Sequence, residues 1–324
     1  MILVTGGAGY IGSHVVKLLS RYGVDTVVFD NLSRGHREMV STGEFIEGDL
    51  SDRDLLVKIL REKKVGSVIH FAASSLVGES EEDPHKYYQN NLSNGINLLG
   101  AMLDAGVKRI VFSSSAAVYG NPVHVPIKED HPTEPTNVYG STKLIIEGML
   151  KKYSEAYGIR SVCLRYFNAA GADPDAQIGE DHTPETHLIP IVLDCALGRR
   201  KEVTVFGTDY DTPDGTCIRD YIHVNDLADA HIKALDHIEK RDGAYFYNLG
   251  NGKGFSVRKV IESTERVTGK KIAIKEGPRR KGDPGQLVAG SGQIIKDLGW
   301  NPQFPDLDSI IETAWRWHRK RFSA

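Results

Sequence analysis

Three glycines, Gly6, Gly9 and Gly12, constrain the fold of this chain more than any other feature. They follow a short apolar run at residues 2–4, and apolar residues then recur at helical spacing from Ile11 to Leu19. A strand, a glycine turn and a helix in this order are typical of a dinucleotide-binding site. Glycine lets the backbone approach a pyrophosphate, and the helix offers this anion its free N-terminal amide groups. A tight turn without a ligand can have the same spacing, so the surrounding residues must distinguish a dinucleotide-binding turn from a turn that binds nothing.

The acidic residue Asp30 supports the dinucleotide interpretation. It ends the second apolar run, at residues 26–29, and lies at the distance from the glycines that this motif requires. Its carboxylate can accept hydrogen bonds from the adenosine ribose and repel a 2′-phosphate, which favours NAD over NADP. Asp49 leaves two interpretations open: an adenine contact, or a residue at the start of the next helix, with Ser51 as the helix cap.

Strand and helix patterns alternate through the first half of the chain. This alternation predicts an α/β fold, a Rossmann-type doubly wound parallel sheet with helices on both faces. Ligands of such sheets bind at the carboxyl ends of the strands, where this chain has mostly small and polar residues. The apolar runs end near Val4, Phe29, Ile46, Ile69, Phe112 and Leu164.

The composition of the chain changes near Asn168. Gly, Pro, Asp and Thr become frequent, and the strand–helix alternation loosens. We therefore expect an NAD-binding domain at residues 1–167. A smaller C-terminal lobe of mixed α/β structure, at residues 168–324, is expected to bind the substrate, with some of its segments returning to the first domain.

The net charge, the lengths of the apolar stretches and the cysteine spacing exclude several other classes of protein. A net charge of −3 over 324 residues gives no general attraction to nucleic acid or to anionic membranes. No apolar stretch reaches the roughly 20 residues that a membrane helix needs. Cys163, Cys195 and Cys217 have neither metal-ligand nor redox spacing, so we expect no metal site. The chain begins with a predicted core strand, which leaves no room for a signal peptide and predicts a cytoplasmic location.

Tyr139 and Lys143 form the candidate catalytic pair. They lie four residues apart on a helix predicted at about residues 137–157, so their side chains share one face. A nearby ammonium, like a positively charged nicotinamide, lowers the pKa of a tyrosine and makes it a better base. Ser115, at the end of the preceding strand, completes a set suited to removing a proton from an alcohol whose carbon loses a hydride. Alone, such a pair is more often a surface pair, but its place after the glycine turn favours catalysis.

The longer motifs extend over nearly the whole chain, which resembles the extended short-chain dehydrogenase/reductase superfamily and, within it, the UDP-glucose 4-epimerases. The Tyr-x3-Lys pair identifies only the superfamily, whereas the serine block together with Arg-Asp-Tyr-Ile-His-Val is more specific. The motifs are Thr5-Gly6-Gly7-Ala8-Gly9-Tyr10-Ile11-Gly12, Ser113-Ser114-Ser115-Ala116, Tyr139-Gly140-Ser141-Thr142-Lys143 and Arg219-Asp220-Tyr221-Ile222-His223-Val224.

The resemblance implies reversible C4 epimerisation of UDP-glucose and UDP-galactose through a 4-keto intermediate, with tightly bound NAD+ as a transient hydride acceptor. It implies that Tyr139 is the base, that Lys143 tunes it and holds the nicotinamide ribose, and that Ser115 bonds the C4 hydroxyl. The other NAD contacts that it implies are Gly6, Gly9, Tyr10, Ile11, Asp30, Asn31, Asp49, Leu50, Phe71, Ala72, Asn90 and Tyr166. The other UDP-sugar contacts are Asn168, His187, Leu188, Thr204, Phe206, Arg219, Arg280, Asp283 and Leu287.

Two of these positions also follow from their chemistry. Arg219 and Arg280 come from separate loops of the second lobe and could converge on a diphosphate, which guanidinium groups bind bidentately. The competing interpretation is a pair of solvated surface arginines. The Gly- and Pro-rich loops around them favour the binding site.

Some positions depart from the family pattern and leave the substrate open. His187 stands in a Thr-His pair where an Asn-Asn pair is common, and Leu287 stands where a bulky tyrosine is often found. The smaller leucine leaves room for an N-acetyl group, so UDP-N-acetylhexosamines are alternative substrates, as are UDP-glucuronate and UDP-pentoses. A dehydratase would need acidic residues where this chain has Ala116 and Ala117. A non-catalytic NAD-sensing protein would not need the Ser115–Tyr139–Lys143 set.

The resemblance also implies a homodimer. Members of this family often pack the helices near residues 85–105 and 140–157 into a four-helix bundle between two subunits. The apolar residues Ile96, Leu99, Leu144 and Met149 suit such an interface, and they suit an intramolecular core equally well.

Overall fold

The computed structural model describes residues 1–280 and 282–323. Its centre is a seven-stranded sheet in the order β11-β6-β5-β4-β1-β2-β3, in which all neighbouring strands are parallel. Six of the strands coincide with the predicted apolar runs, which confirms the doubly wound α/β fold. The strands are β1 (Ile2–Thr5), β2 (Thr26–Asp30), β3 (Glu44–Glu47), β4 (Ser67–His70), β5 (Arg109–Ser115), β6 (Arg160–Tyr166) and β11 (Ala244–Leu249).

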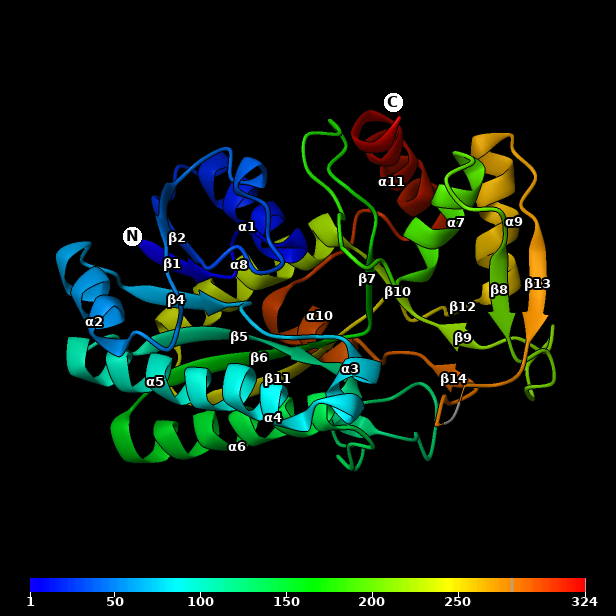
Figure 1. The fold of residues 1–324 in the computed structure, drawn as a ribbon. Helices are drawn as coiled ribbons and strands as arrows, with labels where there is room; N and C mark the ends of the chain where they lie inside the picture. The colour runs from blue at the N-terminus through cyan, green and yellow to red at the C-terminus, as the bar shows by residue number, and fades with distance from the viewer. Residues whose placement is uncertain (281, 324) are drawn as a thin grey trace.

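Helices cover both faces of this sheet (Figure 1). Helices α1 (Tyr10–Arg21), α8 (Val224–Lys240) and α10 (Gly292–Leu298) contribute to one apolar cluster, and α2 (Arg53–Glu62), α5 (Asn94–Ala105) and α6 (Val138–Tyr157) contribute to the other. Because both faces are covered, the inner strands β1, β2 and β4 are buried along nearly their whole length rather than in alternation. Strand β2, for example, is buried at all five positions.

Helix α6 matches the predicted helix closely. The Asn137 side chain accepts a hydrogen bond from the Gly140 amide at 2.8 Å and caps the start, and Gly158, with a φ of 66°, ends the helix. The long helix predicted near residues 85–105 is also present. It runs without a break through α4 (Pro84–Tyr87), a π-helical segment η2 (Tyr88–Ser93) and α5, and it is preceded by the short helix α3 (Val77–Glu82).

The second lobe is built from small sheets and three helices. Two of the sheets are pairs of strands: β7 (Asn168–Ala170) with β10 (Tyr221–His223), and β8 (Val203–Phe206) with β13 (Ile274–Gly277). The third sheet contains β9 (Ile218–Arg219), β12 (Phe255–Ser256) and β14 (Gln286–Leu287). The helices are α7 (Leu188–Ala196), α9 (Val257–Thr268) and α11 (Leu307–Phe322). The chain returns to the large sheet through α8, β11 and α10. Figure 1 shows α7, α9 and α11 grouped at one end of the molecule.

Short 3-10 turns complete the described elements: η1 (Arg37–Met39), between β2 and β3, and η3 (Ala116–Tyr119), directly after β5. No helix within residues 1–280 and 282–323 combines the length and the apolar character needed to cross a membrane.

Candidate active site

The glycine turn brings the ends of two strands into close contact. Gly6 has a φ of 73°, and a Cβ atom there would lie only 2.5 Å from the amide nitrogen of Ala72, which follows β4. A Cβ at Gly12 would lie 2.3 Å from the carbonyl oxygen of Gly6, so this glycine lets α1 pack against the turn. Helix α1 begins immediately after Gly9 and directs its first amides towards the turn. This cradle fits a dinucleotide pyrophosphate.

Asp30 lies beside the same turn, at the end of β2. One of its carboxylate oxygens accepts a hydrogen bond from the Ala8 amide and the other accepts one from the Leu32 amide, each at 2.9 Å. Burial raises the pKa of Asp30, and these two amide bonds oppose the shift. The carboxylate is therefore held next to the place where the adenosine ribose of a bound NAD is expected.

The loop after β3 corrects one expectation. Helix α2 is capped by Asp52, whose side chain accepts from the Leu55 amide at 2.9 Å, so the proposed Ser51 cap is wrong. Asp49 instead accepts from the Ser51 amide at 2.9 Å and from the Asn31 side chain at 2.7 Å. Asp49 is therefore free of a helix-capping role and faces the loop that follows Asp30.

The predicted NAD residues gather at the carboxyl edge of the sheet. Asn90 lies in the π-helical segment, where its side-chain amide donates to the Ser74 hydroxyl at 3.1 Å. Such segments often mark functional sites, and this one has no signature that we read from the sequence. The strand ends, the loops after them and the start of α1 carry the other predicted residues, which are Gly6, Gly9, Tyr10, Ile11, Asp30, Asn31, Asp49, Leu50, Phe71, Ala72 and Tyr166.

The catalytic candidates lie at the same edge. Tyr139 and Lys143 are only 9% and 3% exposed, so they are not a solvated surface pair. The Lys143 ammonium donates a hydrogen bond to the Ser113 carbonyl at 2.8 Å and lies 5.7 Å from the centre of the Tyr139 ring. The Ser115 hydroxyl accepts from the Ala117 amide at 3.1 Å and also interacts with the Tyr139 phenol. The three side chains thus converge as the sequence predicted.

Their electrostatics differ from the prediction. Burial raises the pKa of Tyr139, and the Ser115 hydrogen bond only partly opposes this shift. Burial also lowers the pKa of Lys143 to about 7, although the Glu147 carboxylate nearby acts in the opposite direction. Burial therefore outweighs the lowering of the Tyr139 pKa that was expected from Lys143, because both groups lie in the same apolar surroundings. The lowering expected from a charged nicotinamide stays a prediction.

A buried ion pair lies behind the catalytic face. Arg165 donates to both carboxylate oxygens of Glu147, at 2.9 and 2.6 Å, and to the Tyr119 hydroxyl at 2.8 Å. The Ser114 hydroxyl also donates to Glu147, at 2.6 Å. Our reading of the sequence missed this network. The available signal was the position of Glu147, one helical turn after Lys143 on the same face.

The predicted UDP-sugar residues come mainly from the second lobe. Arg219 is ion-paired with Asp283, and the Arg280 guanidinium lies 4.2 Å from the centre of the Phe206 ring. Asn168 begins β7, Leu188 begins α7, Thr204 and Phe206 lie on β8, and Leu287 lies on β14. Leu287 packs against the apolar cluster that contains Ala116, immediately after Ser115. The two lobes thus bring Leu287 close to the catalytic residues.

His187 is engaged by neighbouring carboxylates through one of its two ring nitrogens. Its Nδ1 atom lies 2.5 Å from a carboxylate oxygen of Glu180 and 3.5 Å from one of Glu185. The substrate contact predicted for His187 stays a prediction, and it would have to come from the other ring nitrogen, Nε2.

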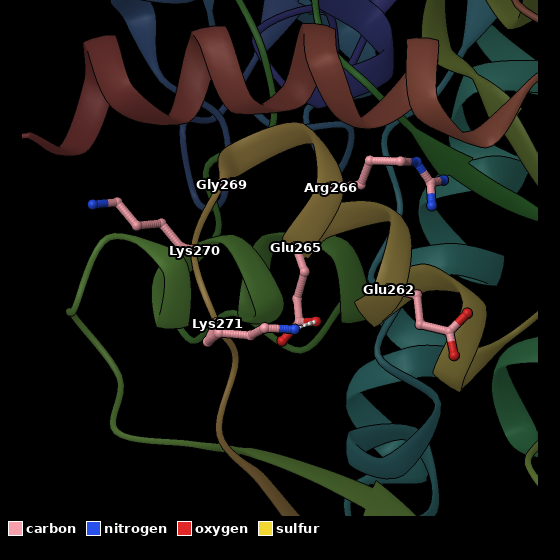
Figure 2. Close-up of a pocket in the computed structure, with 6 residues that line it drawn as sticks. All are labelled: Glu262, Glu265, Arg266, Gly269, Lys270 and Lys271. Atoms are coloured by element: carbon pink, nitrogen blue, oxygen red, sulfur yellow. Dashed lines mark hydrogen bonds and ion pairs between the residues drawn. The ribbon is translucent and has the colours of Figure 1, made fainter.

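A hollow elsewhere in the second lobe has no part in this site. It lies at the end of α9, and Figure 2 shows that the Lys271 ammonium pairs with Glu265 there. Its lining contains no residue that we predicted for catalysis or binding; the six lining residues are Glu262, Glu265, Arg266, Gly269, Lys270 and Lys271.

This chain is similar to known proteins in sequence and in fold. The model of the NAD dependent epimerase/dehydratase family matches residues 2–250. The chain belongs to this family. It is 55% identical to the UDP-glucose 4-epimerase of Halalkalibacterium halodurans, over 98% of this chain and 96% of that protein. The predicted resemblance to the 4-epimerases is therefore confirmed for nearly the whole length.

Two solved structures of this epimerase family agree with the fold. The UDP-glucose 4-epimerase of Brucella ovis in complex with NAD has a TM-score of 0.95 and 50% identity, covering 97% of both chains. That of Bifidobacterium longum, in complex with NAD+ and UDP, has a TM-score of 0.94 and 40% identity, covering 99% of this chain and 98% of the other. The cofactor of this family is thus the one that Gly6 and Asp30 predicted.

Proposed function

We propose that this protein interconverts UDP-glucose and UDP-galactose by inverting the configuration at C4 of the hexose. The observation that carries the proposal is the convergence of Ser115, Tyr139 and Lys143, with Lys143 bound to the Ser113 carbonyl at 2.8 Å. These groups lie at the sheet edge that carries the glycine turn, as a reaction between a sugar hydroxyl and a nicotinamide requires. The close relatives that bear the name UDP-glucose 4-epimerase support the same reaction.

Three side chains of the protein, Ser115, Tyr139 and Lys143, carry out the transfer of the C4 hydroxyl proton. Ser115 donates a hydrogen bond to the C4 oxygen of the sugar, so that the proton of the C4 hydroxyl is left free to point towards the Tyr139 oxygen. Tyr139 takes this proton as the C4 carbon is oxidised and returns it when the carbon is reduced from the other face. Lys143 holds the nicotinamide ribose and, when protonated, stabilises the phenolate.

The residues around the glycine turn fit a resident cofactor. Gly6 and Gly9 would hold the pyrophosphate of NAD, and Asp30 its adenosine ribose. Bound NAD+ would supply the transient hydride acceptor for C4, so that the reaction is redox-neutral overall. The second lobe contributes Arg219 and Arg280 for the substrate diphosphate, and Phe206, beside Arg280, for the nucleoside. We accordingly propose that residues 1–167 bind NAD and that residues 168–324 bind the UDP-sugar.

Other UDP-sugars are the second candidate substrates. Leu287 packs near Ala116 and leaves more room beside the sugar than a tyrosine would, which favours acetamido sugars as additional substrates. Dehydration is disfavoured because Ala116 and Ala117 can neither give nor take a proton.

We also propose a homodimer. Helices α5 and α6 lie side by side in Figure 1, and Ile96 and Ile145 on them are 45% and 42% exposed. Leu99 is buried in the core, so among the predicted interface residues Ile96 is the better candidate. We place the protein in the cytoplasm, where its three free cysteines stay reduced.

The decisive experiment is to incubate the purified protein with UDP-galactose, without added NAD, and to assay UDP-glucose. We expect conversion to an equilibrium mixture, which requires both the reaction and a cofactor that remains bound through purification. An absence of conversion, with and without added NAD, would refute the proposal.

A further inference from the structure

Four metal-binding side chains meet in the loop between β7 and α7. They are Glu180, His182, Glu185 and His187, and one ligand atom from each lies within 4.8 Å of all the others. The residues come from a stretch of eight positions, so the fold of the loop itself brings them together. The site predicted from the sequence uses His187 alone from this group and gives it another role.

The distances between these atoms fit one small ion. Nδ1 of His182 lies 3.3 Å from an oxygen of Glu180 and 3.7 Å from one of Glu185, and Nδ1 of His187 lies 3.5 Å from Glu185. Ligands at 2.0–2.1 Å from a tetrahedral ion are separated by roughly 3.3 Å. The pair of His187 and Glu180 is closer, at 2.5 Å, and these two atoms would separate by a little under 1 Å around an ion.

Part of this cluster is shielded from solvent. Glu180 is 6% exposed and its Oε1 atom is buried, whereas the His187 side chain is 46% exposed. Within the described residues, Oε1 of Glu180 contacts the imidazoles of His182 and His187. A bound ion would therefore replace contacts that the four ligands make with one another.

The surrounding structure holds the ligands in place. One oxygen of Glu185 accepts hydrogen bonds from the Thr186 and His187 amides, at 2.7 and 2.8 Å. The Trp317 indole donates to the Glu180 carbonyl at 3.0 Å and fixes that part of the loop against α11. Such outer contacts orient metal ligands and are part of a metal site.

We propose that this loop binds one divalent transition-metal ion of the zinc class through His182, His187, Glu180 and Glu185. Two imidazoles and two carboxylates suit zinc, and four protein ligands without an open position are typical of a structural site. The proposal does not depend on the enzymatic reaction. It differs from the expectation from the sequence that the chain has no metal site, which rested on the spacing of the cysteines.

The position of the loop gives the ion a role. The ring of His182 meets the Tyr10 ring edge-on, 6.3 Å between centres, and the Tyr10 hydroxyl donates to the Gly171 carbonyl at 2.6 Å. Arg34, near the expected adenosine site, donates to the Thr183 carbonyl at 2.8 Å. A bound ion would therefore clamp the loop against the dinucleotide turn and help to retain the cofactor.

The test uses the untagged full-length protein with its cofactor. After dialysis against a chelator, the protein is titrated with Zn²⁺ by calorimetry and, in parallel, with Co²⁺, whose visible spectrum reports tetrahedral coordination. We expect one ion per chain and the spectrum of a tetrahedral N/O site. The variants His182→Ala and His187→Ala should weaken binding by at least about 100-fold, because each removes a direct ligand. His85→Ala removes an exposed histidine outside the cluster and should bind like the wild type.

Failure of the wild-type protein to bind either ion, or equal binding by the wild type and His182→Ala, would overturn the proposal and leave a cluster of imidazolium–carboxylate pairs. Glu185→Gln offers a milder variant, because its amide oxygen still accepts the two backbone amides. It should fold and retain NAD, measured by absorbance after denaturation, yet bind Zn²⁺ at least about tenfold more weakly. These readouts need no activity, so they remain informative if the proposed reaction is wrong.

Discussion

The Lys143 ammonium binds the carbonyl oxygen of Ser113, 2.8 Å away, and this contact fastens α6 to the end of β5. Because Tyr139 lies one turn earlier on α6 and Ser115 two residues later on β5, the contact also sets the distance between the phenol and the serine hydroxyl. The geometry of the proposed catalytic residues therefore depends on the contact between one helix and one strand.

Replacement of Tyr139 by Phe removes the proton acceptor and keeps the ring. We expect the rate of UDP-galactose conversion to fall by about 10²–10⁴-fold, since this is the range for loss of a general base. Tyr157→Phe, at the exposed end of α6, is the matched control and should keep the wild-type rate. Full activity of Tyr139→Phe would exclude the mechanism.

Lys143 should make stability depend on pH. Burial lowers its pKa to about 7 in the folded protein, whereas the unfolded chain keeps the ordinary value of 10.5. Between pH 7 and pH 10.5 the Lys143 side chain is protonated in the unfolded chain but has lost its proton in the folded protein. The Lys143 contribution to the free energy of unfolding therefore rises with pH in this range. Below about pH 7 the full penalty of the buried charge applies.

We therefore expect the difference in unfolding free energy between wild type and Lys143→Met to rise by up to about 1.4 kcal/mol per pH unit in this window. Urea denaturation at several pH values measures it. Lys151→Met, exposed on the same helix, should show no such slope relative to wild type. A flat difference for Lys143→Met would show that the ammonium is not destabilised by burial.

Glu147→Gln should destabilise the fold strongly. The change leaves Arg165 charged and buried without its carboxylate, which typically costs about 3–5 kcal/mol. Chemical denaturation measures the loss, and the double variant Glu147→Met/Arg165→Met should recover much of it because neither charge of this pair is left buried without its partner. Glu155→Gln breaks an exposed pair with Lys152 on the same helix and should change stability little. A similar small effect of Glu147→Gln would refute the importance of the buried pair.

Asp30 should determine the choice of cofactor. Asp30→Asn retains an acceptor for the Ala8 amide but removes the charge that repels a 2′-phosphate. We expect the affinity for NADP relative to NAD to rise at least about tenfold, which corresponds to about 1.4 kcal/mol. Binding of both cofactors to stripped protein measures the ratio. Asp54→Asn, at an exposed position of α2, serves as the control, and an unchanged ratio in Asp30→Asn would argue against a ribose contact.

Leu287 should set the tolerance for acetamido sugars. We expect the wild type to epimerise UDP-N-acetylglucosamine, and Leu287→Tyr to lose this activity while it still converts UDP-galactose. Chromatography of the UDP-sugars measures both reactions. If the wild type gives no epimer of UDP-N-acetylglucosamine at enzyme concentrations that equilibrate UDP-galactose, the hypothesis is wrong.

The sequence alone determined the parts that depend on neighbours along the chain. The glycine turn, the six apolar runs and the Tyr139–Lys143 spacing each follow from local periodicity or local sterics, so the parallel sheet and the catalytic face were predictable. The resemblance to a family then supplied the reaction. The predicted Ser51 cap failed because Asp52, one residue later, offers the same local chemistry.

Only the tertiary structure decided the features that depend on distant residues or on burial. Arg165 meets Glu147 because β6 and α6 pack together, and Lys143 has a lowered pKa because the same packing excludes water. The seventh strand, β11, joins the sheet from the far half of the chain. His187 is engaged by Glu180 because the loop before α7 folds back on itself against Tyr10 and Trp317. Charge interactions act through space, and their strength depends on the surroundings that folding creates.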